Sequence, residues 1–333
     1  MKIAFFTSNK GGSPLIGGLE RGMMSLGHQV HVYRPGEGYD LIVICNQVAH
    51  DADYVYPEFP LGNTPIAFLD SAEFGYHTRL PDRRHLYANT FTEAAMAHDT
   101  KNRGQQERLR RFLEGRSFPY FLREYMKGID YPESYHPIDY PLYHLSECPK
   151  APNRNEYLSR DLDLFLAWGH SHPWRPLIEQ ELRNCHTKCE IFKRDMGAGV
   201  NMPQDEYFRR QEAAKVGVSF DGYGSGSFRM TEVLVRSCLL MGPLGIVTRA
   251  PLKQGVTCLG YGVRNEGEQF ICSSIATALE CALRDREGAF EIYEAGYHHC
   301  MTHLTERATA QYVIETVERH DWGKATELTI CQQ

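Results

Sequence analysis

No segment of this 333-residue sequence has the length and apolar character of a membrane-spanning helix. Such a helix needs about 20 consecutive apolar residues, and no window comes close. The opening MKIAFFTSNKGG has one lysine and a very short apolar run, without a small-residue cleavage site. We therefore expect no signal peptide, no transmembrane segment and a cytoplasmic location.

The sequence also lacks the cysteine and histidine spacings of a zinc site. Its ten cysteines are scattered, and the two local groups at 185–189 and 298–303 match no recognised set of ligands. Without a secretory signal, we expect the cysteines to be reduced and mostly buried. The pattern predicts no metal site.

The chain as a whole has no excess of positive charge. Its formal net charge is −6 at pH 7, which argues against bulk electrostatic binding of nucleic acid. The segment 79–127 differs, with eleven Lys/Arg against six Asp/Glu. This segment is either a solvated helix face or a patch for peripheral contact with DNA, another anionic acceptor or an anionic membrane.

The sequence does contain an alternation of short apolar runs and helical patterns. Apolar residues make up 42% of the chain and charged residues 23%, an ordinary globular composition in a length that suits two domains. Continuous apolar strands alternating with helices are typical of a parallel sheet covered on both faces. In the first half the expected strands are 2–7, 30–33, 39–46 and 64–71, with a helix that begins at Leu19 and closes at Gly27.

This alternation stops and then restarts. Residues 75–145 form an aromatic and basic excursion, and the polar, proline-containing segment 146–157 is the best linker candidate. After it, the expected strands are 163–169, 188–193, 216–222 and 244–250. The expected helices are the second part of 170–184, 206–215, the second part of 221–242, 273–285, 287–303 and 306–320.

The patterns predict an α/β protein with two Rossmann-like domains that face each other across a cleft. The chain begins as a Rossmann-like domain does, with a strand, a Gly-rich turn and a helix. We expect an N-terminal domain at 1–150 and a C-terminal domain at 158–305. Residues 306–333 would form a closing helix that returns toward the N-terminal domain.

The segment 221–242, DGYGSGSFRMTEVLVRSCLLMG, places glycines and serines in front of a helix. Glycines permit close backbone approach, and a helix N-terminus offers free N–H groups with a partial positive charge. Such a place suits phosphates, and Arg229 could add a charge-assisted contact to a diphosphate. The predicted phosphate-binding residues are Gly224, Ser225, Gly226 and Ser227.

Glu232 lies one turn into the same helix. A carboxylate accepts hydrogen bonds from both hydroxyls of a vicinal diol, so Glu232 is a fitting partner for a ribose. The alternative is that 221–227 is a plain loop and that Glu232 pairs with Arg229 and Arg236 on a wet helix face.

Two further turns carry candidate ligand-binding groups. In GHSHPWR, 169–175, His170 and Arg175 follow a strand, where strand ends face the cleft, and Arg175 could neutralise a leaving diphosphate. The alternative is a surface turn packed by Trp174. In SNKGGSPLIGG, 8–18, loop amides could meet an anion or the acceptor, or the segment is a plain turn.

The segment FLDSAEFGYH, 68–77, carries the acid and base groups of the first half. Asp70 ends an expected strand, and Glu73 and His77 follow it. A general base must stand opposite the leaving group, which makes Asp70 the base candidate. The alternative is that Asp70 caps the next turn.

The chain resembles GT-B glycosyltransferases, most closely the family-1-type bacterial and phage enzymes with spore-protein-CgeB-like C-terminal domains. The resemblance is carried by three stretches and covers nearly the whole chain, loosely. These stretches are GYGSGSFRMTEVLVRSCLLMGPLGIV, EIYEAGYHHCMTHLTERATAQYVIETV, and FPYFLREY followed by YPLYHL.

The resemblance implies roles for several residues. Glu232 would hold the donor's ribose diol, residues 225–227 would lie near the diphosphate and Arg175 near its charge. Gly17 and Gly18 would lie under the donor–acceptor junction. Many retaining members carry a second glutamate seven residues from the first. Here Ser225 stands at that spacing before Glu232, which leaves inversion or retention open.

We therefore expect a hexosyl- or pentosyltransferase that uses a nucleotide-sugar as co-substrate, with a UDP-sugar as the expected donor. No metal or other cofactor is expected, because amides, arginines and helix dipoles would stabilise the departing diphosphate. The acceptor hydroxyl belongs to a glycan or to a hydroxymethylated base in phage DNA. The alternative is a non-catalytic sugar-nucleotide-binding protein or a two-lobed small-molecule binder.

Overall fold

A computed structural model describes most of the chain. The described residues are 1–6, 14–46, 64–70, 114–123, 125, 127, 130–142, 150–169, 174–185, 187–194, 202–219, 228–242, 246–266, 269–273 and 275–326. The chain divides into two compact units. The first comprises Met1–Pro141, Ile246–Arg249 and Glu306–Gln333, and the second Leu142–Gly245 and Ala250–Thr305.

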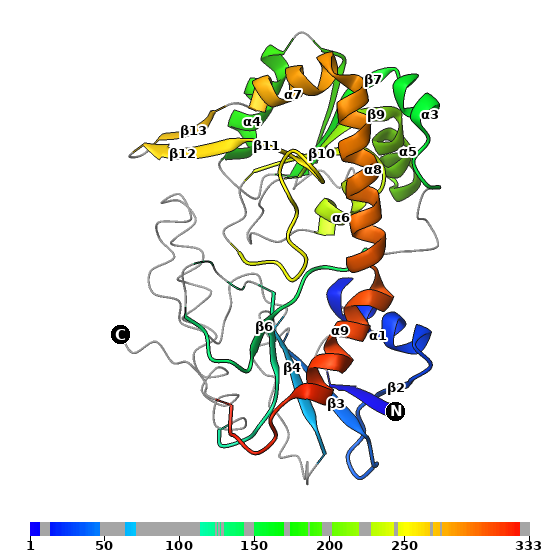
Figure 1. Cartoon of the computed structure of the whole chain (residues 1–333), viewed down its shortest axis with the longest axis vertical. Coiled ribbons are helices and arrows are strands. Elements are labelled where there is room, and N and C mark those ends of the chain that lie inside the picture. The colour runs from blue at the N-terminus through cyan, green and yellow to red at the C-terminus, as the bar shows by residue number, and fades with distance from the viewer. Residues whose placement is uncertain are drawn as a thin grey trace. The chain divides into compact units, whose positions relative to one another are not determined.

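The first unit is built on a parallel sheet in the order β2-β1-β3-β4-β5-β6, of which Figure 1 labels β2, β3, β4 and β6. Its strands are β1 (Lys2–Phe6), β2 (Gln29–Val32), β3 (Leu41–Asn46), β4 (Ile66–Asp70), β5 (Tyr120–Leu122) and β6 (Tyr135–Pro137), all paired parallel. Helices α1 (Pro14–Ser25) and α9 (Glu306–Arg319) lie side by side in this unit.

The two faces of this sheet have separate cores, because successive strand residues point to opposite faces. Ile3 and Phe5 of β1 pack in one core with residues of α1 and α9. Ala4, between them, belongs to the other core, which is rich in aromatic side chains. There Tyr120 and Tyr135 stack with ring centroids 4.3 Å apart.

The contact between α1 and α9 depends on glycine and on an ion pair. A Cβ atom built on Gly22 would lie 2.1 Å from the main-chain oxygen of Glu306, so only glycine allows this close approach. Beside it, Arg21 Nε donates to both carboxylate oxygens of Glu306 at 3.1 Å. Helix α9, at the end of the described chain, is thereby fixed to the helix that follows the first strand.

The second unit also contains a parallel sheet, in the order β11-β10-β9-β7-β8. Its strands are β7 (Leu162–Gly169), β8 (Cys189–Arg194), β9 (Ala214–Ser219), β10 (Cys238–Met241) and β11 (Leu259–Gly260), and an antiparallel pair, β12 (Gly262–Glu266) and β13 (Gln269–Ser273), lies outside it. Its helices are α3 (Arg154–Leu158), α4 (Trp174–Asn184), α5 (Gln204–Ala213), α6 (Phe228–Leu234), α7 (Ile275–Arg284) and α8 (Arg286–His303).

Strand β7 shows how this sheet is covered on both faces. Leu164, Leu166 and Trp168 belong to the large core that also contains side chains of α4, α7 and α8. Phe165 belongs to a smaller core on the opposite face, against which Tyr207 of α5 packs. Two parallel sheets with two covered faces each confirm the predicted α/β class with two Rossmann-like domains.

The structure corrects several predicted elements. The helix expected in the second part of 221–242 ends at Leu234, and its apolar tail is the buried strand β10. No strand covers the expected range 244–250 within the described residues 246–250. A short apolar run fits a strand or a buried helix equally well. For residues 238–241 the sequence pattern favoured a helix, whereas the structure has a strand.

Other differences concern segments read as irregular. Residues 14–18, expected as loop, form the first turns of α1. The aromatic excursion supplies two parallel strands, β5 and β6, to the first sheet. The expected linker ends in helix α3, which Asn153 caps by accepting a hydrogen bond from the Glu156 amide. Strands of three residues are too short to show periodicity.

None of the helices within the described ranges is both long and apolar enough to cross a lipid bilayer.

Candidate functional site

The candidate site lies in the second unit, at the carboxyl edge of its sheet. Strand β7 has β8 on one side and β9 on the other, so the strand order reverses beside it. In open α/β sheets, ligands bind outside the carboxyl ends of the strands at such a reversal. Helix α4 follows β7 and helix α6 follows β9, which places the first turns of both helices at this edge.

Glu232 is held at this edge by a chain of hydrogen bonds. The hydroxyl of Tyr207 donates to Oε2 of Glu232 at 3.2 Å, and Nε2 of Gln211 donates to that hydroxyl at 2.9 Å. Only 6% of Glu232 is exposed. Burying a carboxylate is costly unless it is hydrogen-bonded, and Tyr207 of α5 supplies one such bond.

Tyr207 is suited to donate this hydrogen bond because its phenol stays protonated. Burial raises the pKa of Tyr207, the charge of Arg229 lowers it, and the Glu232 carboxylate raises it further. The ring packs against Phe165 of β7, with centroids 5.9 Å apart. The sheet therefore fixes the ring, and the ring fixes the carboxylate.

The two arginines near Glu232 have different surroundings. Arg229 donates through Nη1 to the main-chain oxygen of Ala167 in β7, and its guanidinium lies 5.8 Å from the centre of the Tyr207 ring. Arg236 is 1% exposed, lies 3.6 Å from the centre of the Phe208 ring and donates to the main-chain oxygen of Glu232 at 3.1 Å. The alternative of a wet helix face around Glu232 is therefore wrong.

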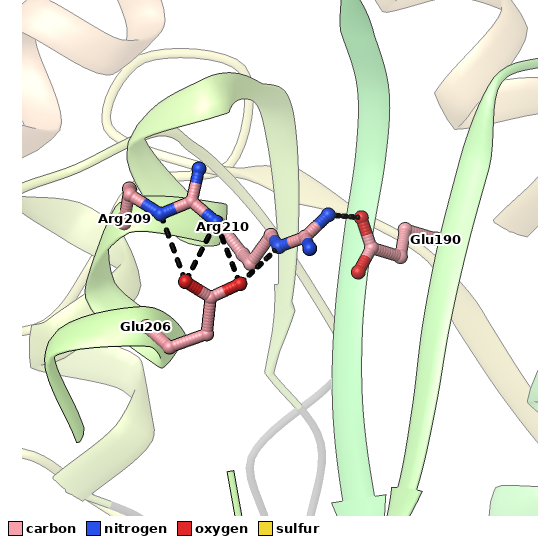
Figure 2. A network of polar contacts seen from close by, with 4 residues as sticks. All are labelled: Glu190, Glu206, Arg209 and Arg210. Carbon is pink, nitrogen blue, oxygen red and sulfur yellow. Dashed lines mark hydrogen bonds and ion pairs between the residues drawn. The ribbon is translucent and has the colours of Figure 1, made fainter. Parts of the chain in front are cut away.

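Helix α5 is anchored on its outer side by a polar network (Figure 2). Glu206 lies between Arg209 and Arg210, accepting from Arg209 Nε at 2.8 Å and from Arg210 Nε at 2.6 Å. Nη1 of Arg210 also donates to Glu190 of β8 at 2.6 Å. The same helix thus joins the edge strand on one side and carries Tyr207 on the other.

Asp70, the candidate base, lies in the first unit at the end of β4. It is fully buried, and Tyr120 Oη donates to its Oδ2 at 2.9 Å. Its main-chain oxygen accepts from the amide of Arg123 at 3.1 Å. The side chain is therefore already a hydrogen-bonded part of the sheet end.

Gly17 and Gly18, predicted in a loop, lie in the helical turns of α1. A Cβ atom on Gly18 would lie 2.6 Å from Cγ of Pro141, and one on Gly17 would lie 3.4 Å from Nη1 of Arg21. Glycine at position 18 therefore avoids a clash with the Pro141 side chain.

Arg175 lies in the first turn of α4, at the edge where it was expected. Other residues predicted to bind the donor lie outside the described residues; these are His170, Gly224, Ser225, Gly226 and Ser227. The same holds for Glu73, His77 and residues 79–113 of the basic segment.

The structure adds two residues that the sequence did not single out, Tyr207 and Gln211. Both lie on the inner face of α5, four residues apart, which is the spacing of neighbours on a helix surface. With the structure known, the two residues can be recognised in the sequence EYFRRQEAAK as an aromatic and an amide within a strongly charged helix. Nothing in the sequence, however, links them to Glu232 more than twenty positions away.

The arrangement can hold a polyol next to an anion. Glu232 offers carboxylate oxygens in a nearly dry place, where hydrogen bonds to ligand hydroxyls are stronger than in water. The first turns of α4 and α6 offer main-chain amides at the same edge, and Arg175 and Arg229 lie in these two turns. Within the described residues, no three His, Cys, Asp or Glu side chains come together as metal ligands.

Comparisons with known proteins give a fold but no family. No protein-family model matches this sequence. No curated protein matches it either. Among solved structures, HepE of Anabaena in complex with UDP and glucose is 10% identical over 96% of this chain and 99% of its own, with a TM-score of 0.54. HepE in complex with UDP-glucose is 12% identical over the same shares, with a TM-score of 0.52.

At such identities the likeness concerns the fold alone. It agrees with the two Rossmann-like sheets described above, and the chain has the GT-B fold of glycosyltransferases.

Proposed function

We propose that the chain is a glycosyltransferase that takes a sugar from a nucleoside-diphosphate sugar, with a UDP-sugar as donor. The observation that carries this proposal is the buried Glu232 carboxylate, held by Tyr207 at the carboxyl edge of the second sheet. The fold likeness to HepE, solved with UDP-glucose, supports a sugar nucleotide as the ligand. The sequence resemblance to family-1-type enzymes with CgeB-like C-terminal domains supports the same class.

In this proposal Glu232 accepts hydrogen bonds from the two ribose hydroxyls. The main chain of 224–227 and the first turn of α6 hold the diphosphate, and Arg175 and Arg229 offset its charge as it departs. Gly17, Gly18 and His170 belong to the same donor site. The sugar passes through an oxocarbenium-like transition state, so stabilising the leaving diphosphate is the main catalytic task. No metal is required for that step.

The fate of the acceptor proton depends on the stereochemistry. If the reaction inverts, a base must take the proton of the attacking hydroxyl, and Asp70 is the candidate. Tyr120 already donates to Asp70, so the substrate hydroxyl would use the remaining acceptor capacity of the carboxylate. If the reaction retains configuration, no protein base is needed.

The acceptor is a glycan or a hydroxymethylated base in phage DNA. The net charge of −6 favours the glycan, whereas the basic segment 79–127 favours DNA or an anionic membrane surface. Measuring duplex-DNA binding over a range of salt concentrations separates the two. Binding through phosphate contacts weakens steeply with salt, and a glycan-specific enzyme would show no such binding.

The first experiment is a thermal-shift panel of nucleotides and nucleotide-sugars, run on wild type, Glu232→Gln and Glu280→Gln. A ligand at a hundredfold excess over its Kd stabilises the folded state by about 2.7 kcal/mol. We expect a UDP-sugar to raise the Tm of wild type but not of Glu232→Gln. Glu280, 51% exposed on α7 beside Arg284, is the matched control and should leave the shift intact.

Turnover then distinguishes an enzyme from a silent binder. Asp70→Asn should abolish transfer with donor binding intact if the reaction inverts. Donor binding without any transfer or donor hydrolysis in wild type would support the non-catalytic alternative. No shift with any nucleotide would overturn the proposal as a whole.

A further inference from the structure

A second polar site lies in the second unit, at the opposite edge of the sheet from Glu232. A cavity of about 780 Å³ opens where β7, β8 and β9 begin. Asp161 and Lys188 immediately precede β7 and β8, and Lys215 is the second residue of β9. Because the strands are parallel, these starting points meet at the amino edge, and the cavity is separate from the candidate donor site.

The charged lining of this cavity is predominantly basic. Its charged members are Arg160, Lys188, Lys215, Arg286, Asp161 and Asp163. Four cations face two carboxylates, so the lining carries net positive charge. A volume of this size lies in the range of small-molecule sites and exceeds the needs of a single water or ion.

One of the two carboxylates is already neutralised within the protein. Nζ of Lys215 donates to Asp163 Oδ1 at 2.9 Å, and the amide of Lys188 donates to Oδ2 at 3.1 Å. Burial raises the pKa of Asp163, but these hydrogen bonds and the charges of Lys215 and Arg286 outweigh burial and lower it. Lys215 is only 4% exposed. Its ammonium has three donors, and Asp163 takes one.

Arg160 is fixed in place by the fold. Its Nη1 donates to the main-chain oxygens of Ala214 at 2.7 Å and Arg236 at 2.8 Å. Its guanidinium also lies 5.0 Å from the centre of the Tyr157 ring and 5.2 Å from that of Tyr293. An arginine held this way lines the cavity with little side-chain freedom left to lose.

Two cations of the lining are not held in an ion pair, although Arg286 is near enough to Asp163 for its charge to act on that carboxyl. Within the described chain, neither the Lys188 ammonium nor the Arg286 guanidinium forms an ion pair, and both side chains are exposed. Arg286 is the first residue of α8, at the end where the helix dipole also favours an anion. The site thus combines a buried ammonium, a fixed guanidinium and two unpaired cations around one cavity.

We propose that this cavity binds a small phosphate-bearing anion. Guanidinium and ammonium groups converging on one space are the chemistry that recognises phosphate oxygens. The volume leaves room for a phosphorylated small molecule rather than inorganic phosphate alone. The proposal does not depend on the proposed function, because none of its residues belongs to the donor site.

The test is calorimetric titration of inorganic pyrophosphate into the full chain saturated with UDP, which fills the donor site. We expect one pyrophosphate per chain, with an affinity that falls as salt increases. The double variant Lys188→Gln/Arg286→Gln should weaken binding by about tenfold or more. Glucose 1-phosphate and inorganic phosphate, titrated in parallel, distinguish a phosphorylated metabolite from free phosphate as the ligand.

The matched control is Lys253→Gln/Arg284→Gln, which removes the same two charges from exposed positions of the same unit outside the cavity lining. Equal affinity in the two double variants, or no binding to the UDP-saturated chain, would overturn the proposal. If UDP itself does not bind, the proposed function fails, and the titration is repeated without it. The difference between the two double variants then still decides whether the cavity is an anion site.

Discussion

The hydroxyl of Tyr207 donates a hydrogen bond of 3.2 Å to Glu232, joining α5 to α6 below the carboxyl edge of the second sheet. The tyrosine thereby determines where the Glu232 carboxylate lies and which of its oxygens face a ligand. Tyr207 does not have to touch the ligand to influence it, so we regard it as a positioning residue.

Tyr207→Phe removes this hydrogen bond and leaves the ring in place. Hydrogen bonds to charged groups contribute about 1.5–3 kcal/mol, so we expect UDP-sugar affinity to fall by roughly tenfold to a hundredfold. Isothermal titration with the donor found in the thermal-shift panel measures this. An unchanged Kd would show that Glu232 keeps its position without Tyr207.

Tyr157→Phe is the matched control and also a prediction about stability. Tyr157 is buried in the same unit, and within the described residues its hydroxyl has no hydrogen-bond partner. A buried hydroxyl without a partner costs free energy, so we expect its removal to raise the free energy of unfolding by about 1 kcal/mol. Urea denaturation measures this change, and donor affinity should stay at the wild-type value. A clear loss of stability would mean that the hydroxyl has a partner after all.

Gly22→Ala tests the contact between α1 and α9. The added methyl group would overlap the main chain of Glu306, which a side-chain rotation cannot relieve. We expect the free energy of unfolding to fall by about 1–3 kcal/mol, although alanine favours a helix over glycine. Chemical denaturation of the two proteins gives the difference.

Gly38→Ala is the control for this substitution. A Cβ atom at Gly38 meets nothing within 4 Å, so the alanine has space. Its stability should equal or slightly exceed that of wild type. If both alanine variants behave alike, close helix approach is not what requires glycine at position 22.

Acid should destabilise the first unit through His136. Burial lowers the pKa of His136, and the charge of nearby His320 lowers it further. The unfolded chain therefore binds the proton more readily than the folded one. This histidine's contribution to stability is complete above its ordinary pKa of about 6.5 and is lost as the pH falls through the lowered value, by at most about 1.4 kcal/mol per pH unit.

Urea unfolding at pH 7.5, 6.5 and 5.5 tests this for wild type and His136→Gln. The variant should show a shallower loss of stability on acidification, because one proton-binding difference is gone. His31→Gln, an exposed position on β2, is the control and should keep the wild-type slope. A variant slope equal to wild type would place the pH dependence elsewhere.

The sequence predicted the strands best where burial is continuous. The Leu-Ile-Val-Ile run of β3 has both faces buried, so every position is apolar, as is typical of an interior strand of a parallel sheet. The same kind of run in β10 was assigned to a helix, because it directly follows a true helix. Strands β5 and β6 are short, and their burial comes from partners distant in the sequence.

The candidate site shows the same limit. The sequence identified Glu232 from its place after a Gly-rich stretch, but it could not show that the residue is buried. Arginines three residues before and four residues after Glu232 are typical of a solvent-exposed helix face. Only the packing of α5 against β7 shows that this face is buried instead. Tyr207 was missed for the same reason, since its role depends on which helix lies next to α6.

The first unit is assembled from three separate segments of the chain, the last of which contains α9. Val313, Ile314 and Val317 of that helix fill a core whose other side comes from β1 and α1. During synthesis, the ribosome therefore makes the sheet of this unit long before the helix that covers it. Domains often fold as they emerge from the ribosome, but this unit lacks the α9 part of its core until the whole second unit has been translated. The second unit is therefore the one whose segments are all synthesised first.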